Sequence, residues 1–332
     1  MTSEYNRELG SLTEEEIVDL IASRLVHRPS YGEYLSYPDD ARDILPRGPR
    51  IIMAMDAYTV KSLKLPWRSL DDVAWAAFTG PVSDVLVKGG IPLYAMIALG
   101  TPSEWKTNEL LEFINGLREA SSFYNIRVLG GDTNNSSEPW IAITVAGFTS
   151  IKNPPSRRGL KPGDRVIVTG VYGAMGYVVK HGFEEALKQE WVVSATKRPR
   201  ARIEIGYLVS THYRAITATM DVSDGLGYTL HYLSKLGGYG IKIEQPPLTH
   251  RELNEHCREN TRCILEYCLN GGEEYGVVMG VREEHVNEVV SELEYYGIEY
   301  SIVGRVVDIE PGIYFNGEKL AILRYDQFKG WS

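Results

Sequence analysis

Six acidic sites carry the side chains in this sequence that are best suited to chemistry. Each falls at the end of an apolar, strand-like run or beside small residues at a turn. They are Asp39 and Asp40 in PDDA, Asp56 in MDAY, Asp84 in VSDV, Asp132 in GGDT, Asp221 and Asp224 in DVSDGL, and Glu273 and Glu274 in GGEEY. Mg²⁺ takes oxygen ligands and is usually shared between carboxylates and substrate phosphates. The pattern therefore predicts a site that holds one or more magnesium ions.

Each aspartate taken alone has a simpler interpretation. An Asp at a turn is a favoured helix N-cap, so Asp224 before GLGYTL and Asp132 before TNNSS could each satisfy backbone amides. Taken singly, capping is the favoured interpretation. Taken together, carboxylates beside buried strands are costly unless a cation neutralises them, which favours the metal interpretation.

Two further segments have chemistry that the sequence leaves open. The segment GVYGAMG (170–176) follows a strand-like run but lacks the Lys-Ser/Thr end of a P-loop, so a phosphate contact and a tight packing turn are equally supported. Arg157 and Arg158 could clamp a phosphate or could be solvated linker charges. The seven histidines form no metal-spaced pair, and no G-x-S-x-G motif is present.

Composition and charge narrow the class of protein. The 332 residues are 43% hydrophobic and 24% charged, which is ordinary for a globular protein. The formal charge of −9 argues against nucleic acid or an anionic membrane as the main partner. The N-terminus is polar and no run approaches a membrane span, which predicts a cytoplasmic protein. The cysteines Cys257, Cys263 and Cys268 match neither a zinc ribbon nor a redox pair, so reduced thiols are expected.

Alternating strand and helix patterns position these residues in two α/β domains. A capping-box spacing at Thr13 and Glu16 begins a predicted helix over 11–25. Strands are predicted at 50–60, 93–102, 126–132 and 140–150. The segment 69–92 predicts a buried helix that Pro81 should kink or divide and that Gly89 and Gly90 should end, and a further helix is predicted at 108–124. The Pro- and Gly-rich segment 151–164 is the expected boundary between domains at 1–150 and 151–332.

The ordered set of motifs resembles the thiamine-monophosphate kinase family. That family belongs to a superfamily with aminoimidazole-ribonucleotide synthetase, selenophosphate synthetase and a hydrogenase-maturation protein. The motifs that carry the resemblance run through most of the chain: PDDA, MDAY, SDVLVKGGIP, GGDT, RRGLKPGD, DVSDGL, GGEEY and RYDQF. Each motif alone is weak, whereas eight in order are specific.

The resemblance implies an ATP- and Mg²⁺-dependent transfer of the γ-phosphoryl group to thiamine monophosphate, a reaction that depends on positioning and charge neutralisation. It implies a homodimer in which the mixed N-terminal sheets pair into a barrel, beside a C-terminal α/β domain. The implied metal ligands are Asp40, Asp56, Asp84, Asp132, Asp221 and Asp224. The implied ATP contacts are Gly130, Gly131, Asp132, Thr133, Arg157 and Ser223, the catalytic set is Asp221, Asp224 and Arg157, and the substrate contacts are Glu274, Tyr325 and Phe328.

The sequence departs from the family pattern mainly where the acceptor should bind. Met55 replaces a hydroxyl residue, a His-Phe pair is missing from TVKSLKLPW, and GEDYEL has become GEEYGV, with Glu274 and Gly276 at the changed positions. Gln327 replaces the histidine of a final His-Phe pair. Two alternatives therefore stay open: another ATP-using member of the superfamily, or a protein that binds nucleotide or thiamine phosphates without turnover.

Overall fold

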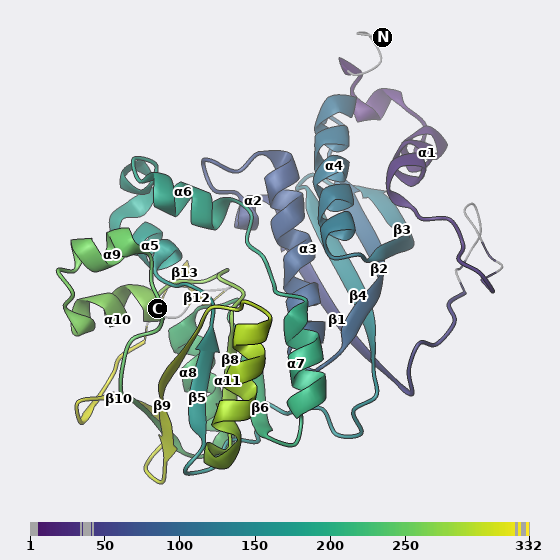
Figure 1. Ribbon diagram of the computed structural model, residues 1–332. Helices are drawn as coiled ribbons and strands as arrows, with labels where there is room; N and C mark the ends of the chain where they lie inside the picture. Colours follow the sequence, from purple (N-terminus) through teal and green to yellow (C-terminus); the bar gives the residue numbers. More distant parts are fainter. Residues whose placement is uncertain are drawn as a thin grey trace. The chain divides into compact units, whose positions relative to one another are not determined.

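The computed structural model describes residues 6–33, 35, 41, 43–322, 325–326 and 330–331. The chain divides into two compact units, which are described separately (Figure 1). The N-terminal unit comprises residues 1–85 and 90–150, and the C-terminal unit comprises residues 86–89 and 151–332.

The N-terminal unit contains a mixed four-stranded sheet with the strand order β1-β4-β2-β3. Only β2 and β3 run parallel; the other neighbours are antiparallel. Its elements are the 3₁₀ turn η2 (Leu9–Ser11), α1 (Glu14–Leu25), β1 (Arg50–Thr59), α2 (Val60–Leu63), α3 (Leu70–Leu86), β2 (Ile91–Thr101), α4 (Thr107–Phe123), β3 (Arg127–Asn135) and β4 (Trp140–Thr149).

One face of this sheet packs against helices. Along β1, Ile52, Ala54, Asp56 and Tyr58 are half-buried while the residues between them are exposed, as strand alternation requires. Figure 1 shows α3 and α4 lying beside each other next to the sheet. The two helices approach closely because Gly116 of α4 has no side chain, and a Cβ there would overlap the backbone of Asp71.

Helix α3 is buried over most of its length because its small and apolar residues leave no polar face. It continues through Pro81, so of the two predicted outcomes, a kink or a division into two helices, the division does not occur. Phe78 and Val82, on either side of the proline, are fully buried, and their packing outweighs the local preference for a break. The predicted stop is confirmed: the helix ends at Leu86, and Gly89 follows with a φ of 69°.

The C-terminal unit contains a seven-stranded mixed sheet with the order β11-β10-β7-β9-β5-β8-β6. Its only parallel pair among the described strands is β10 with β7. Its elements are β5 (Arg165–Thr169), α5 (Ala174–Ala186), α6 (Glu190–Lys197), α7 (Glu204–His212), β6 (Ile216–Asp221), α8 (Leu226–Gly237), β7 (Gly240–Ile243), α9 (Arg251–His256), α10 (Thr261–Leu269), β8 (Val277–Val281), η3 (Glu283–His285), α11 (Val286–Tyr295), β9 (Tyr300–Val307), β10 (Gly312–Phe315), β11 (Glu318–Lys319), and the separate pair β12 (Tyr325–Asp326) and β13 (Gly330–Trp331).

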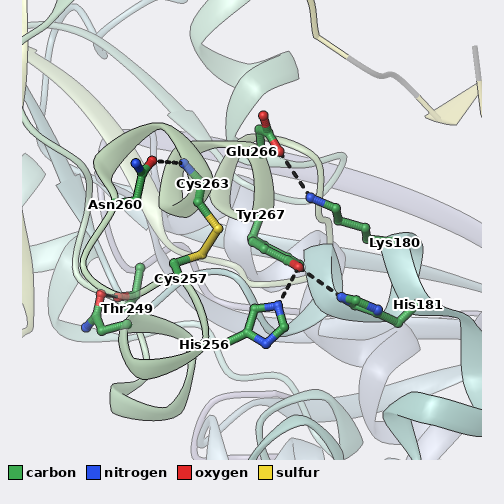
Figure 2. Close-up of a disulfide and its surroundings, with 10 residues drawn as sticks. Lys180, His181, Thr249, His256, Cys257, Asn260, Cys263, Glu266 and Tyr267 are labelled. Carbon is green, nitrogen blue, oxygen red and sulfur yellow. Dashed lines mark hydrogen bonds and ion pairs between the residues drawn. A yellow bond between two sulfur atoms is a disulfide. The ribbon is translucent and has the colours of Figure 1, made fainter.

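The expectation of three reduced cysteines was wrong. Cys257 and Cys263 form a disulfide between the end of α9 and the start of α10 (Figure 2). Cys268 is a buried free thiol. The turn between the helices folds back through Arg258 and Glu259, both with positive φ, which brings the two sulfur atoms together. Sequence spacing alone gives no sign of this reversal, because both residues are types that usually avoid such a conformation.

The described residues include no helix that is both long enough and apolar enough to cross a membrane.

Candidate active site

The N-terminal unit brings two of the six acidic sites together at the contact between β1 and α3. A Cβ built on Gly80 of α3 would lie 2.6 Å from Oδ2 of Asp56 and would overlap the hydroxyl of Tyr58. Asp84 is one helical turn beyond Gly80, and helical side chains lean towards the preceding turn. The glycine therefore admits the Asp56 carboxylate against the face of α3 that also carries Asp84, and carboxylate oxygens are the ligands that a hard divalent cation takes.

Asp132 lies elsewhere in the same unit. It is on β3, at the opposite edge of the sheet from β1, which places it about 14 Å from Asp56 at the usual strand spacing. The register pairs Asp56 with Ile143, Ile143 with Ile97 and Ile97 with Gly131, so Asp132 points to the other sheet face. Its exposed carboxylate accepts a hydrogen bond from the Asn134 amide at 2.9 Å. The strand continues to Asn135, which excludes the capping interpretation of Asp132.

The GGDT segment lines a pocket of about 170 Å³ between α1 and the β2–β3 edge. The pocket combines two kinds of surface. Val18, Ile21 and Leu25 of α1 supply an apolar wall, and residues 130–133 supply a polar, glycine-containing strand. Gly131 is required here because a Cβ would overlap the carbonyl of Ile97 on the neighbouring strand. This arrangement suits a ligand with a flat apolar part; because the acids Glu14 and Asp132 also line the pocket, an anionic part would need a bound cation beside it.

In the C-terminal unit, three glycine-containing turns meet at the ends of β6, α5 and α8. The amide of Glu273 donates to the carbonyl of Ser223 at 2.7 Å, and the amide of Tyr275 donates to that of Val222 at 3.0 Å. Gly271 lies against Gly225 and Gly176, where added Cβ atoms would collide with backbone. The structure thus joins three motifs that are far apart in sequence: GVYGAMG, DVSDGL and GGEEYG.

The DVSDGL turn places its two aspartates differently. Asp221 is the last residue of β6 and is 2% exposed, whereas Asp224 is exposed just before α8. The N-cap position of α8 is occupied by Gly225, which has no side chain to cap with. Asp224 therefore does not occupy the capping position that the simpler interpretation assigned to it, and its carboxylate stands at a helix N-terminus, where anions and their metal partners bind.

The carboxyl oxygens of Glu274 are buried beside the N-terminus of α5. Neither of its carboxyl oxygens accepts a hydrogen bond of normal geometry. Burial raises its pKa well above the usual carboxyl range, and the nearby amide of Gly173 opposes that shift only in part. Burial also raises the pKa of the Tyr172 hydroxyl and of the Cys268 thiol. The negative charge of Glu274 makes a smaller contribution in the same direction. Glu274 therefore holds a proton more tightly than an ordinary glutamate does.

The unusual GEEYGV sequence has a structural reason at Gly276. A Cβ there would overlap both the carbonyl of Thr169 and the hydroxyl of Tyr172. Tyr172 is completely buried, and its hydroxyl donates to the Thr169 carbonyl at 2.8 Å. The tyrosine of GVYGAMG thus occupies the space that a side chain at position 276 would need.

Lys88 also belongs to this region, although no sequence pattern selects it as a site residue. Its ammonium group donates to the carbonyl of Thr219 at 2.7 Å and to that of Pro155 at 3.2 Å. Thr219 is two residues before Asp221, and Pro155 is two residues before Arg157, which is half-buried. Lys88 therefore fixes the two backbone segments that carry these expected site residues. A lone lysine before two glycines has no sequence signature for that role.

Some expected site residues lie outside the part of the chain that the structure describes. Asp40 and Phe328 lie outside the described residues, and of Tyr325 only the backbone pairing of β12 with β13 is described. In the part of the chain that the structure does describe, no group of three or more His, Cys, Asp or Glu side chains is arranged to hold a metal ion. Of the expected magnesium ligands, Asp56 and Asp84 lie in the N-terminal unit, and Asp221 and Asp224 lie in the C-terminal unit.

Family models match both halves of the chain. Residues 38–149 match the AIR synthase related protein, N-terminal domain, and residues 161–313 match the C-terminal domain of the same family. The two matched segments fall in the two units of the structure. The prediction of a two-domain synthetase-like fold is confirmed.

Individual relatives agree with the family models. A thiamine-monophosphate kinase of Aquifex aeolicus is 30% identical over 269 residues, which cover 78% of this chain and 80% of the relative. A solved structure described as AaThiL complexed with AMPPCP and TMP is 26% identical, with a TM-score of 0.70, and covers 84% of this chain and 87% of its own. The kinase of Stenotrophomonas maltophilia shares the fold at 21% identity, with a TM-score of 0.78 and coverage of 93% and 98%.

Proposed function

Since the chain belongs to the AIR synthase related family in both of its halves, we propose that it transfers the γ-phosphoryl group of ATP to thiamine monophosphate. One P–O bond of ATP breaks to release ADP, and one forms to the phosphate oxygen of the acceptor, which gives thiamine diphosphate. The observation that carries the proposal is the similarity, over 84% of the chain, to a structure that binds AMPPCP and TMP. The resemblance of all eight motifs to thiamine-monophosphate kinases supports the same reaction.

The pocket at GGDT is the part of the N-terminal unit that we assign to the nucleotide. Its apolar wall from α1 suits a base, and its strand from Gly130 to Thr133 offers amide and hydroxyl groups to phosphates. Asp132 stands at the exposed end of this strand, where it could contact a phosphate-bound cation.

Asp56 and Asp84 are our candidates for magnesium ligands in the N-terminal unit, and Asp221 and Asp224 are those in the C-terminal unit. Bound Mg²⁺ would neutralise charge on the transferred phosphoryl group. The chain's own residues do the positioning. Gly80 lets the Asp56 carboxylate lie against α3, and the turn hydrogen bonds to residues 222 and 223 hold the two C-terminal aspartates in place.

We assign Arg157 and Ser223 to the ATP phosphates, and the acceptor side to Glu274 with Tyr325 and Phe328. A guanidinium binds phosphate oxygens in a planar, two-pronged arrangement, which suits Arg157. Glu274, which holds its proton tightly, would act as a neutral group that does not repel a phosphate. The DVSDGL–GGEEYG contact keeps Ser223 and Glu274 at one place in the fold.

An assay of the purified full-length chain with ATP, Mg²⁺ and thiamine monophosphate tests the reaction. We expect ADP and thiamine diphosphate to appear in equal amounts, with no thiamine diphosphate when Mg²⁺ is chelated. If no thiamine diphosphate forms while ATP still raises the melting temperature, the kinase proposal fails and nucleotide binding without turnover stands. ADP formation with a different phosphorylated acceptor would instead identify another member of the superfamily.

We also propose that the protein is a homodimer formed through the open face of the N-terminal sheet. Met53 is 65% exposed and Met55 is 62% exposed on this face, and Met96 lies in the same row of the sheet as Met55. Exposed apolar side chains in neighbouring strands mark an interaction surface, and a second copy of the sheet offers a matching one. Light scattering should give twice the chain mass for the wild type and a smaller mass for Met53→Glu. A wild-type monomer would refute this proposal.

A further inference from the structure

A second pocket, of about 260 Å³, opens between helix α8 and the strands β10 and β11 of the C-terminal unit. One stripe of α8 forms its wall: Tyr228, His231, Tyr232 and Lys235 are spaced at i, i+3, i+4 and i+7. The opposite face of the helix carries buried residues such as Leu230 and Leu233. The stripe is therefore not needed to pack α8 onto its sheet.

The pocket has an aromatic part and an apolar part. The rings of Tyr228 and Tyr232 stack with centroids 5.5 Å apart and planes 19° apart. Ile313, Leu320 and Ile322 face them across the pocket. A flat ring would find stacking partners on one side and aliphatic contacts on the other.

The rim of the pocket is basic, in a chain whose net charge is −9. Among the described residues, Lys235 has no ion-pair partner and His231 has no hydrogen-bond partner. Lys319 lies across the pocket, and Gly312 makes room for it, since a Cβ there would lie 2.5 Å from Cε of Lys319. Glu310 is the one carboxylate paired with these groups, at 2.7 Å from the Lys319 ammonium. Burial, and then the charges of Lys235 and Lys319, lower the pKa of His231.

The pocket is separate from the proposed kinase site. Lys235 is 11 residues beyond Asp224 along the start and body of α8, a helical rise of about 16 Å. None of the motifs that carry the family resemblance lines it. Its volume equals the liquid-state share of about nine water molecules, which is below the usual range of drug-sized ligand pockets. The occupant must therefore be compact.

We propose that this pocket is a second ligand site, which binds a small ring compound that carries one phosphate group. The ring stacks on the Tyr228–Tyr232 pair, and the phosphate oxygens accept hydrogen bonds from the ammonium groups of Lys235 and Lys319. His231 adds a third donor on the same rim. This inference stands apart from the proposed kinase activity, because it uses none of the residues assigned to that reaction.

Calorimetric titration of the full-length protein with phenyl phosphate tests the site, with inorganic phosphate and phenol titrated separately as its two parts. Phenyl phosphate should bind tighter than either part, because the pocket contacts both of its ends. The Cε1–H NMR signal of His231, assigned with His231→Gln, should shift as phenyl phosphate is added and thereby locate the binding. An unshifted His231 signal would overturn the proposal.

Two variants with the same change in net charge distinguish binding in the pocket from a general effect of the protein's charge. Lys235→Glu should weaken phenyl phosphate binding about tenfold, since it replaces an attraction with a repulsion. Lys188→Glu changes the net charge equally, at an exposed ion pair with Glu185, and should leave the affinity unchanged. Equal affinities in the wild type and Lys235→Glu would refute the site. Thiamine-monophosphate kinase assays of Lys235→Glu should remain at the wild-type rate, so the two proposals fail independently.

Discussion

The two units hold their candidate site residues by different means. In the N-terminal unit, Asp56 and Asp84 project from regular elements, so strand alternation and helix periodicity decide their directions. In the C-terminal unit, Asp221, Asp224 and Glu274 stand in or beside turns, and backbone hydrogen bonds between the turns decide where they lie. The first kind of site needs a glycine, Gly80, where a side chain must fit against a helix, whereas the second depends on glycines that allow two backbones to touch.

The glycine contact between the turns should give the largest effect. In Gly225→Ala the new Cβ collides with the carbonyl of Gly271, at a φ of 100°, and we expect a loss of more than about 3 kcal/mol in the free energy of unfolding. Gly163→Ala is the matched control, because its φ is 94° but nothing lies within 4 Å of the new Cβ. Its loss should be about 1 kcal/mol, from backbone strain alone. Equal losses in urea denaturation would show that the contact between the turns is unimportant.

The Asp224 carboxylate should matter for turnover rather than for folding. Asp224→Asn keeps the shape of an exposed side chain but removes its charge, so we expect kcat to fall about 100-fold or more. The urea midpoint should change little, because exposed substitutions usually cost within about 0.5 kcal/mol. Wild-type kcat in this variant would remove Asp224 from the proposed metal site.

Lys88 is a residue outside the turns that holds two segments leading to expected site residues of the C-terminal unit. Lys88→Met removes two hydrogen bonds from a charged donor to the carbonyls of Thr219 and Pro155, and should lower the free energy of unfolding by about 2 kcal/mol. If Lys88 positions Asp221 and Arg157, kcat should also fall at temperatures where the variant is fully folded. Lys188→Met, at an exposed ion pair, should change neither quantity. A stability loss with unchanged kcat would limit Lys88 to a structural role.

Substitution of the buried acid Glu274 should have the smallest effect, and it should raise the free energy of unfolding rather than lower it. Its folded pKa is raised, so the folded state binds more protons than the unfolded state, and stability falls as the pH rises above the ordinary carboxyl value of 4.5. Glu274→Gln should remove this slope and raise the free energy of unfolding at neutral pH by about 1 kcal/mol or more. The exposed Glu252→Gln should do neither. An unchanged pH slope in Glu274→Gln would show that Glu274 is ionised in the folded protein.

Local sequence patterns predicted most of the elements correctly. The capping box at Thr13 and Glu16 is present, and the strands and helices expected in the first 150 residues appear close to their predicted positions. The exceptions are places where packing outweighed a local rule. Helix α3 continues through Pro81, and Asp56 and Asp132 lie inside strands rather than at their ends.

The sequence by itself determined the motifs, their order and the family, because these depend only on which residues follow one another. It also indicated which residue types could bind magnesium and phosphate. The tertiary structure alone decided which residues meet: Asp56 with α3 through Gly80, the DVSDGL turn with GGEEYG, Cys257 with Cys263, and Lys88 with two distant carbonyls. These contacts join segments that are distant in sequence or that reverse direction. They depend on the close approach of backbones, and local periodicity carries no information about that approach.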